Sequence, residues 1–157
     1  MNFQHLKDND SIVESALVES ALMDFCIRSK PYDFCSIKNG SARLIQIKKY
    51  CEELLKKCDI FYYKQNGRIR FFMAISREVS YIEIQFIFGD PIHVVKDFKA
   101  FREFYWKKFD CVLPFAGAVK RKHQVKAYLN FIKRKDPYAK IFLDKDPILV
   151  SYTRDGV

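Results

Sequence analysis

The chain lacks an apolar run that approaches the roughly 18 residues needed to cross a membrane as a helix. Its first ten residues, MNFQHLKDND, are too polar and acidic for a signal peptide. Repeats, low-complexity segments and linkers are missing as well. We therefore expect one cytoplasmic domain over 1–157, with a helical amino-terminal part over 1–39 and a core over 40–157.

Motifs that hold metals or phosphates are also missing. The chain has only three His, five Gly and five Cys, and none of the Cys stand in CxxC spacing. Cys51 and Cys58 lie seven residues apart in a helical pattern, which favours core thiols in a reducing compartment. No Walker loop occurs, and no Ser-His-Asp or Cys-His arrangement can be assembled by local spacing. No metal site is expected.

Acidic residues are scarce relative to basic ones. Lys and Arg number 28 against 19 Asp and Glu, which gives a net charge of +9. Residues 120–140 contain many Lys and Arg but one acid, Asp136. This excess suits an anionic partner, such as nucleic acid or an acidic protein, and it equally suits a solvated helix face.

Helical periodicity occupies the amino-terminal part of the chain. Ser11 followed by Glu14 predicts a capping box, with a helix over 12–28 behind it. Between 41 and 58, apolar residues recur every three or four positions and charged residues fill the rest of the wheel. The sequence predicts two successive amphipathic helices.

After residue 58 the apolar residues recur at every second position, as in β-strands. Residues 59–76 predict two strands joined at Asn66-Gly67, a dipeptide that tolerates the positive φ angles of a type I′ turn. The next strand, 81–88, is expected to place Ile82, Ile84, Phe86 and Phe88 on one face and Glu83 on the other. The short connection 76–80 makes it an antiparallel neighbour.

The rest of the chain alternates between predicted helices and strands. Residues 97–109 predict a helix with Phe98, Phe101, Tyr105 and Phe109 buried and with Phe104 and Trp106 at the margins. A strand interrupted by Pro114 and Gly117, a helix over 123–135, and closing strands over 138–143 and 148–153 complete the chain. We expect an α/β (α+β) fold, with a mixed, mainly antiparallel central sheet flanked by helices and a parallel crossover over 81–119.

This order of elements, over roughly 40–153, resembles the GNAT family of acyl-CoA N-acyltransferases. The carboxyl-terminal half, FREFYWKKFDCVLPFAGAVKRKHQVKAYLNFIKRKDPYAKIF, is also similar to small acetyltransferase-like proteins of tailed bacteriophages. The resemblance implies transfer of an acetyl group from acetyl-CoA to an amine of unknown identity.

The resemblance also implies roles for particular residues. Glu83 matches the carboxylate that takes the proton of the attacking amine, and Tyr128 is nearest to the tyrosine that protonates the departing thiolate. The backbone of Phe86, Ile87 and Phe88 would pair with the pantetheine arm. Gly89, Lys96 and Lys99 would contact the pyrophosphate. Two plainer interpretations remain: Glu83 as an exposed residue of a solvated sheet face, and Tyr128 as a packed residue beside Leu129 and Ile132.

One departure from the family keeps alternatives open. The Gly-rich pyrophosphate loop is absent, because GDPIHVVKDFKA contains only Gly89. His93, in this loop, suits either a phosphate contact or a solvated position. The first alternative is a catalytically inactive viral structural or interaction protein whose basic residues 120–140 bind nucleic acid or a partner. The second is a nucleic-acid-binding domain unrelated to acetyltransferases.

Overall fold

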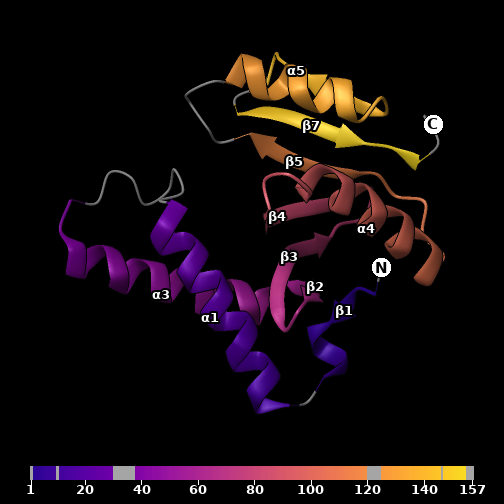
Figure 1. The fold of residues 1–157 in the computed structure, drawn as a ribbon. Helices are drawn as coiled ribbons and strands as arrows, with labels where there is room; N and C mark the ends of the chain where they lie inside the picture. Colours follow the sequence, from indigo (N-terminus) through magenta and orange to yellow (C-terminus); the bar gives the residue numbers. More distant parts are fainter. Residues whose placement is uncertain (1, 10, 30–37, 120–124, 146, 155–157) are drawn as a thin grey trace.

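A seven-stranded mixed sheet forms the centre of the protein in the computed structural model, which describes residues 2–9, 11–29, 38–119, 125–145 and 147–154 (Figure 1). The strands follow the order β1-β2-β3-β4-β5-β7-β6. They are β1 (Gln4–His5), β2 (Asp59–Gln65), β3 (Arg68–Arg77), β4 (Ile82–Gly89), β5 (Phe115–Val119), β6 (Ala139–Phe142) and β7 (Ile148–Tyr152). The helices are η1 (Leu6–Asp8), α1 (Ile12–Ser29), α3 (Gly40–Lys57), α4 (Val94–Lys108) and α5 (Val125–Lys135).

The expected fold class and order of elements are confirmed. Asn66 and Gly67 have φ angles of 54° and 75°, as the type I′ turn requires. The amino-terminal β1 and η1 were not expected. β1 is only two residues long, too short to show a period, and it pairs with β2 at the sheet edge.

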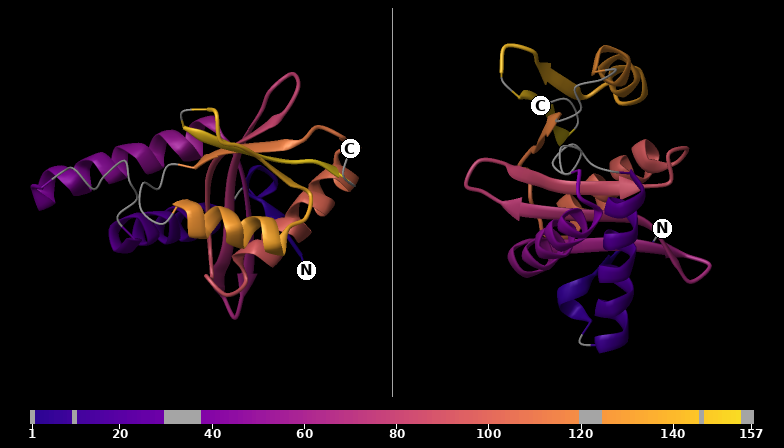
Figure 2. Two further views of the ribbon diagram at one scale, coloured as in Figure 1. Left: turned by 90° about the horizontal axis from the view of Figure 1, so that it is seen from above. Right: turned by 90° about the vertical axis from the view of Figure 1, so that its left-hand side faces the viewer.

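Helices cover both faces of the sheet (Figures 1 and 2). The core on one face contains side chains of α4 and α5, including Phe101 and Leu129, packed on Phe71 and Met73 of β3. The core on the other face contains side chains of α1 and α3 packed on Phe72 of β3. No helix within the described ranges is both long enough and apolar enough to span a membrane.

The expected alternation along β4 is wrong beyond its third residue. Ala74 pairs with Phe86 and Ile75 with Ile84, so Gln85 is an extra residue that forms a β-bulge. Ile82 and Ile84 therefore face α4, whereas Phe86 and Phe88 belong to the core beneath α1 and α3. One inserted residue exchanges the two faces, because side chains alternate with a period of two.

β4 and β5 form the predicted parallel pair, but only briefly. Their pairing consists of Ile82 with Phe115 and Glu83 with Ala116. β5 then pairs antiparallel with β7 along its whole length, and it runs through Gly117 without the expected interruption. Pro114 lies just before β5, where its carbonyl accepts a hydrogen bond from the Ile82 amide.

α4 carries more buried residues than its apolar stripe predicts. Phe98, Phe101 and Tyr105 are buried as expected, while Phe109 is only partly buried. Trp106, which was expected at the margin, is buried and donates to the Leu113 carbonyl. Two charged residues, Asp97 and Arg102, are buried as well.

Asp97 fixes the first turns of α4 to the sheet. A second β-bulge leaves Arg70 of β3 without a partner residue on β2. The Arg70 guanidinium donates to both carboxylate oxygens of Asp97, over 3.0 and 3.1 Å. Two parallel charge-assisted hydrogen bonds fix both the position and the orientation of the helix.

α1 is held to the sheet by a carboxylate that the capping box was expected to use. Ser11 accepts from the Glu14 amide over 3.3 Å, as predicted. The Glu14 side chain turns away from the helix end instead, and it accepts from the Tyr62 hydroxyl over 2.7 Å and pairs with Lys64 over 2.8 Å. Half of the capping box forms, because the sheet offers this carboxylate two stronger partners.

Because of these contacts, the free energy of unfolding should depend on pH in the acid range. The hydrogen bonds from Lys64 and Tyr62 lower the pKa of Glu14 below its ordinary value of 4.5. A lowered folded-state pKa stabilises the fold above the unfolded-state value, and that stabilisation is lost as the pH falls through the folded-state value. We expect Glu14→Gln to cost about 1 kcal/mol near neutral pH and to flatten the pH dependence below about pH 4.5. Urea unfolding across pH measures both, and Glu52→Gln on the exposed side of α3 should change neither.

Candidate functional site

The candidate site lies where β4 leaves β5. The two strands pair over two residues and then separate, so the part of β4 that follows Glu83 has a hydrogen-bonded neighbour on the β3 side only. The bulge at Gln85 stands at this point. Backbone N–H and C=O groups that lack a strand partner on one side are available to an extended ligand. Phe86, Ile87 and Phe88, predicted to pair with a pantetheine arm, occupy this stretch.

Glu83 lies on the α1 and α3 face at the last paired position. It stands opposite Ser76 on one side and Ala116 on the other. Ser76 lies against Cys58, with 3.9 Å between its hydroxyl and the thiol, at the carboxyl end of α3. Ala116 is small, so it leaves the Glu83 carboxylate accessible from the β5 side.

The Glu83 carboxylate is half-buried, and no hydrogen bond or ion pair engages it among the residues that the structure describes. Its charge acts on one neighbour: burial raises the pKa of the Cys58 thiol, and the charges of Asp59 and Glu83 raise it further. Because no described residue binds it, this carboxylate keeps its hydrogen-bonding capacity for a ligand. It is well suited to accept a proton from a bound ligand.

Aromatic side chains form a wall beyond the bulge on the same face. Phe88 stacks on Phe25 of α1 at 4.6 Å and on Phe72 of β3 at 5.0 Å between ring centroids. Phe86 meets Tyr50 of α3 at 5.9 Å. The bulge turns Phe86 and Phe88 toward this face, where they join α1 and α3 to β4.

The β4–α4 junction, expected to bind pyrophosphate, is occupied by its own aspartate. The Asp90 carboxylate accepts from the Ile92 amide over 3.0 Å, and the Asp90 carbonyl accepts from the His93 and Val94 amides over 2.9 and 2.8 Å. These bonds engage two loop amides and the first amide of α4, whereas Asp90 does not engage the amides of Val95 and Lys96 in the first turn of that helix. An added Cβ at Gly89 would come within 3.1 Å of the Arg70 carbonyl, so Gly89 serves backbone packing.

The remaining predicted site residues lie elsewhere or outside the described part. Lys96 and Lys99 are exposed on α4, and Lys99 lines a hollow on the outer side of that helix. His93 lies 4.0 Å from the Asp90 carboxylate. Tyr128 belongs to α5, but its side chain is outside the described part, as are residues 120–124 with His123. Sequence reasoning missed Gln85, Ala116 and Asp90, because strand register and loop hydrogen bonds decide their roles.

Cysteines and metals add little to the site. Cys26, Cys51 and Cys111 are buried free thiols, and Cys58 is half-buried. Cys35 lies outside the described residues. Among the described residues, no group of three or more His, Cys, Asp or Glu is arranged to hold a metal ion.

Comparison with known proteins relates the fold to acetyltransferases. No family model and no curated protein sequence matches the chain. Among solved structures, the PaiA N-acetyltransferase of Thermoplasma acidophilum in complex with coenzyme A is similar with a TM-score of 0.64 and 12% identity, covering 98% of this chain and 100% of that one. An aminoglycoside 6′-N-acetyltransferase complexed with coenzyme A has a TM-score of 0.59 and 9% identity over 98% of this chain and 97% of that one.

A further similar structure is the aminoglycoside 6′-N-acetyltransferase of Enterococcus faecium, with a TM-score of 0.58, 8% identity and coverage of 98% and 97% of the two chains. Identities this low establish a shared fold and no more. The protein therefore has the GNAT fold, as its order of elements predicted. The resemblance to bacteriophage proteins remains a prediction from sequence.

Asp90 yields a prediction about the junction. Asp90→Ala removes the carboxylate that caps the Ile92 amide, so the free energy of unfolding should fall by about 1 kcal/mol. The same change removes a negative charge from the loop that is predicted to contact pyrophosphate, so any affinity for coenzyme A should rise. Isothermal titration calorimetry with coenzyme A measures the affinity. Asp144→Ala, which removes an exposed charge in the β6–β7 connection, is the matched control. Weaker binding by Asp90→Ala would mean that the carboxylate supports the ligand.

Proposed function

We propose that the protein is an N-acyltransferase that moves an acetyl group from acetyl-CoA to the amine of an acceptor. One observation carries the proposal: Glu83 is a half-buried carboxylate without a partner among the described residues, beside the point where β4 and β5 separate. The bulge and the separation of the strands can be explained by packing and stability alone. The unpaired carboxylate of Glu83 cannot.

The fit to acyl-CoA differs between its two ends. The unpaired edge of β4 from Phe86 to Phe88 suits the amide-bearing pantetheine arm, which can add to a strand as an extended peptide does. The amides of Ile92, His93 and Val94 do not suit the pyrophosphate in this conformation, since Asp90 holds them. Acyl-CoA would supply an activated thioester. Its phosphates would require contacts other than these amides.

The chain's own contribution is to bind and deprotonate the acceptor. An amine with a pKa near 10 is protonated at neutral pH and must lose a proton before it attacks a carbonyl carbon. Glu83 can accept that proton directly or through a water molecule, from an amine on the α1 and α3 face. The wall of Phe25, Tyr50, Phe86 and Phe88 would hold the apolar part of the acceptor and limit access of water. Tyr128 remains the proposed donor of a proton to the thiolate.

A catalytically inactive protein is the second candidate function. It would bind nucleic acid or a partner protein through the basic residues of 120–140, of which Lys126, Lys133, Arg134, Lys135 and Lys140 are exposed. The hold of Asp90 on the junction amides favours this candidate. The unpaired Glu83 favours the first one.

Donor binding is tested by thermal unfolding with acetyl-CoA and free coenzyme A. A ligand that binds only the folded state at about a hundred times its Kd stabilises it by about 2.7 kcal/mol. For a domain of this size, such a gain raises the melting temperature by several degrees. We expect both ligands to give the rise. Equal melting temperatures with and without millimolar ligand would reject the acyltransferase and leave the inactive protein.

The base is tested by Glu83→Gln. Loss of a general base lowers kcat/KM roughly a hundredfold or more, while loss of an unpaired surface carboxylate changes the free energy of unfolding by less than about 0.5 kcal/mol. Acetyl transfer to a panel of aromatic and aliphatic amines, together with urea unfolding, measures both quantities. Glu78→Gln, on the exposed β3–β4 connection, is the control and should retain full activity. Full activity in Glu83→Gln would exclude this role.

A substitution at Ala116 tests binding of the amine acceptor separately from binding of the acetyl-CoA donor. Because Ala116 stands beside Glu83 on β5, Ala116→Leu should fill the space that the amine needs. We expect the acetyl-CoA stabilisation to persist and the KM for the amine to rise at least about tenfold, an effect of about 1.4 kcal/mol. An unchanged KM would place the acceptor elsewhere.

A further inference from the structure

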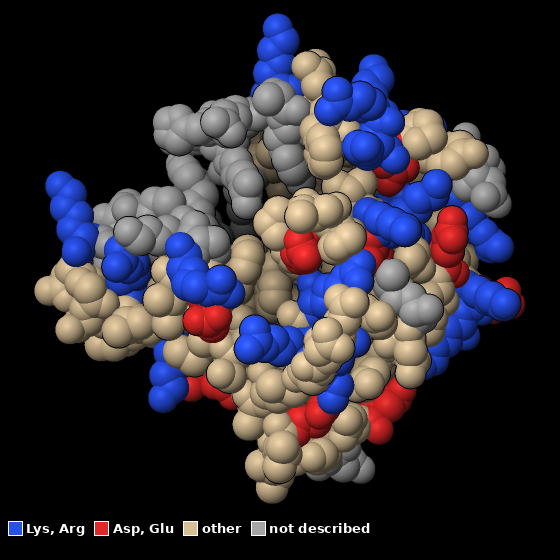
Figure 3. All heavy atoms as spheres, viewed as in Figure 1, with Lys and Arg blue, Asp and Glu red and all other residues tan. Residues whose placement is uncertain are grey.

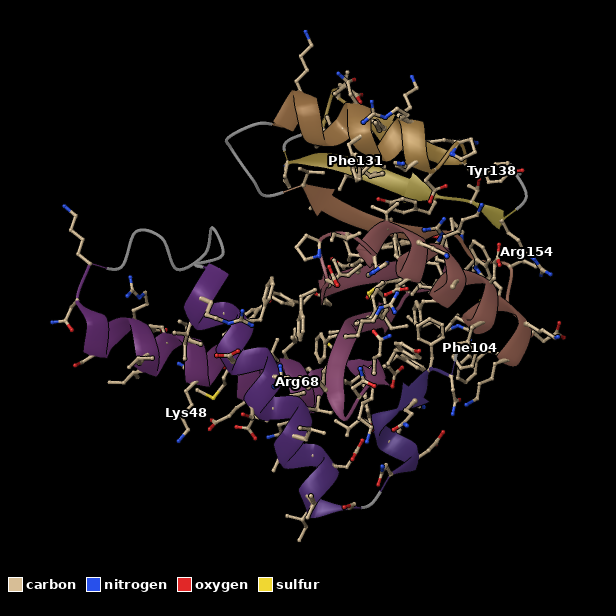
Figure 4. All side chains as sticks on the ribbon, viewed as in Figure 1. Lys48, Arg68, Phe104, Phe131, Tyr138 and Arg154 are labelled. Atoms are coloured by element: carbon tan, nitrogen blue, oxygen red, sulfur yellow. The ribbon has the colours of Figure 1, made fainter. Side chains whose placement is uncertain are left out.

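The hollow on the outer side of α4, which Lys99 lines, is distinct from the candidate site. Its volume is about 400 Å³. α4 contributes Lys99, Arg102 and Lys107, the segment after α5 contributes Tyr138, and Thr153 and Arg154 follow β7. Tyr138 and Arg154 lie near each other beside the carboxyl-terminal part of α4, on the side away from α1 and α3 (Figure 4). The hollow extends along α4 from Lys99 to Lys107, and none of its lining residues belongs to the β4–α4 junction at 89–93.

Arg102 makes the hollow more than a group of surface charges. Its side chain is 3% exposed, and its guanidinium lies between the rings of Phe98 and Tyr152, at 4.5 and 4.7 Å from their centroids. Nη2 donates to the buried Asp136 carboxylate. The rings hold the guanidinium in a fixed plane, which prepares it to bind an anion.

Two further nitrogens of Arg102 are left without acceptors. Nε and Nη1 are buried and have no hydrogen-bond partner within the described chain, and the same holds for Oδ1 of Asp136 and for the Thr153 hydroxyl in the hollow. A buried donor without an acceptor costs about 1–3 kcal/mol. If Asp136 became bidentate, its Oδ1 would accept from one of these two nitrogens at most. An anion in the hollow, after a small adjustment of its lining, would provide the acceptor for the other.

Charge and shape indicate the kind of anion. Four cationic side chains line the hollow, and Glu103 is the single acid among the lining residues. Arg and Lys together favour a phosphate group, which accepts several charge-assisted hydrogen bonds. Trp106 and Tyr138 contribute aromatic surface to the same hollow. Lys and Arg also gather on the surface around α4 and α5 (Figure 3), which raises the local concentration of anions.

We propose that this hollow binds a small organic phosphate monoester. Its phosphate contacts Lys99, Arg102, Lys107 and Thr153, and its organic part contacts Tyr138 and Trp106. The limited volume suits a small molecule rather than a polymer. This site does not depend on the acetyltransferase proposed above.

Trp106 supplies the measurement, because it is the single Trp of the chain and lines the hollow. We would titrate the full chain with phenyl phosphate, inorganic phosphate and phenol at constant ionic strength and record Trp fluorescence. Constant ionic strength separates binding from general screening of surface charge. Phenyl phosphate should give a saturable change, inorganic phosphate a weaker saturable change, and phenol none.

Variants assign the binding to the hollow. Lys107→Gln and Thr153→Val should each weaken phenyl phosphate about tenfold, the effect of losing one charge-assisted or buried hydrogen bond. Lys133→Gln, an exposed lysine of α5 outside the hollow, should bind as the unchanged protein does. Both hollow variants leave the Arg102–Asp136 pair intact, so we expect them to fold, and circular dichroism checks this.

Three results would overturn the proposal. The first is a fluorescence change that rises linearly without saturation. The second is an equal loss in Lys133→Gln, which would indicate diffuse electrostatic attraction. The third is binding of a thymidine oligonucleotide that is tighter than phenyl phosphate and unchanged by Lys107→Gln, which would assign the basic surface to nucleic acid.

Discussion

The extra residue at Gln85 is the constraint on which the rest of the molecule depends. It turns the first half of β4 toward α4 and the second half toward α1 and α3, so a single strand supplies both cores with large side chains. Phe86 and Phe88 then fill the space beneath α1 and α3. The bulge also bends the strand locally, and β4 parts from β5 just before it. One irregularity thus couples the packing of two helical layers to the opening of the sheet.

Buried arginine–carboxylate pairs hold α4 in register with that opening. Arg70, itself the extra residue of a second bulge, binds Asp97 at the amino-terminal part of the helix, and Arg102 binds Asp136 beyond α5. Each pair is costly to desolvate, and removing one partner leaves a buried charge. The pairs contribute by fixing positions: Arg70–Asp97 holds the helix to β3, and Arg102–Asp136 holds it to the residue that follows α5. The α4 hollow takes its geometry from this fixed helix, whereas Glu83 lies on the opposite face of the sheet.

The element order was predictable because it rests on local periodicity. The helix over 41–58, the Asn66-Gly67 turn and the alternation up to Ile84 are all properties of neighbouring residues. Bulges are different, since Gln85 becomes the extra residue only through its register with β3. Glu83 could be singled out from its strand position, whereas Ala116 beside it depends on the β4–β5 pairing. The role of Asp90 was not predictable for a related reason. A Gly-Asp-Pro sequence predicts a turn, but it does not specify which backbone amides donate hydrogen bonds to the Asp carboxylate.

Stability and function place different demands on the same residues, and this difference is the best guide to the site. The bulge, the aromatic wall and the Arg70–Asp97 pair all contribute to packing, so an inactive protein of this fold would retain them. Asp90 satisfies three amides of its own loop, so stability also accounts for it. Glu83 is different, because a Gln or Ser at that position would serve the sheet as well, and no described residue pairs with its charge. Its carboxylate, placed where the strands separate, is the feature of this region that folding alone does not explain.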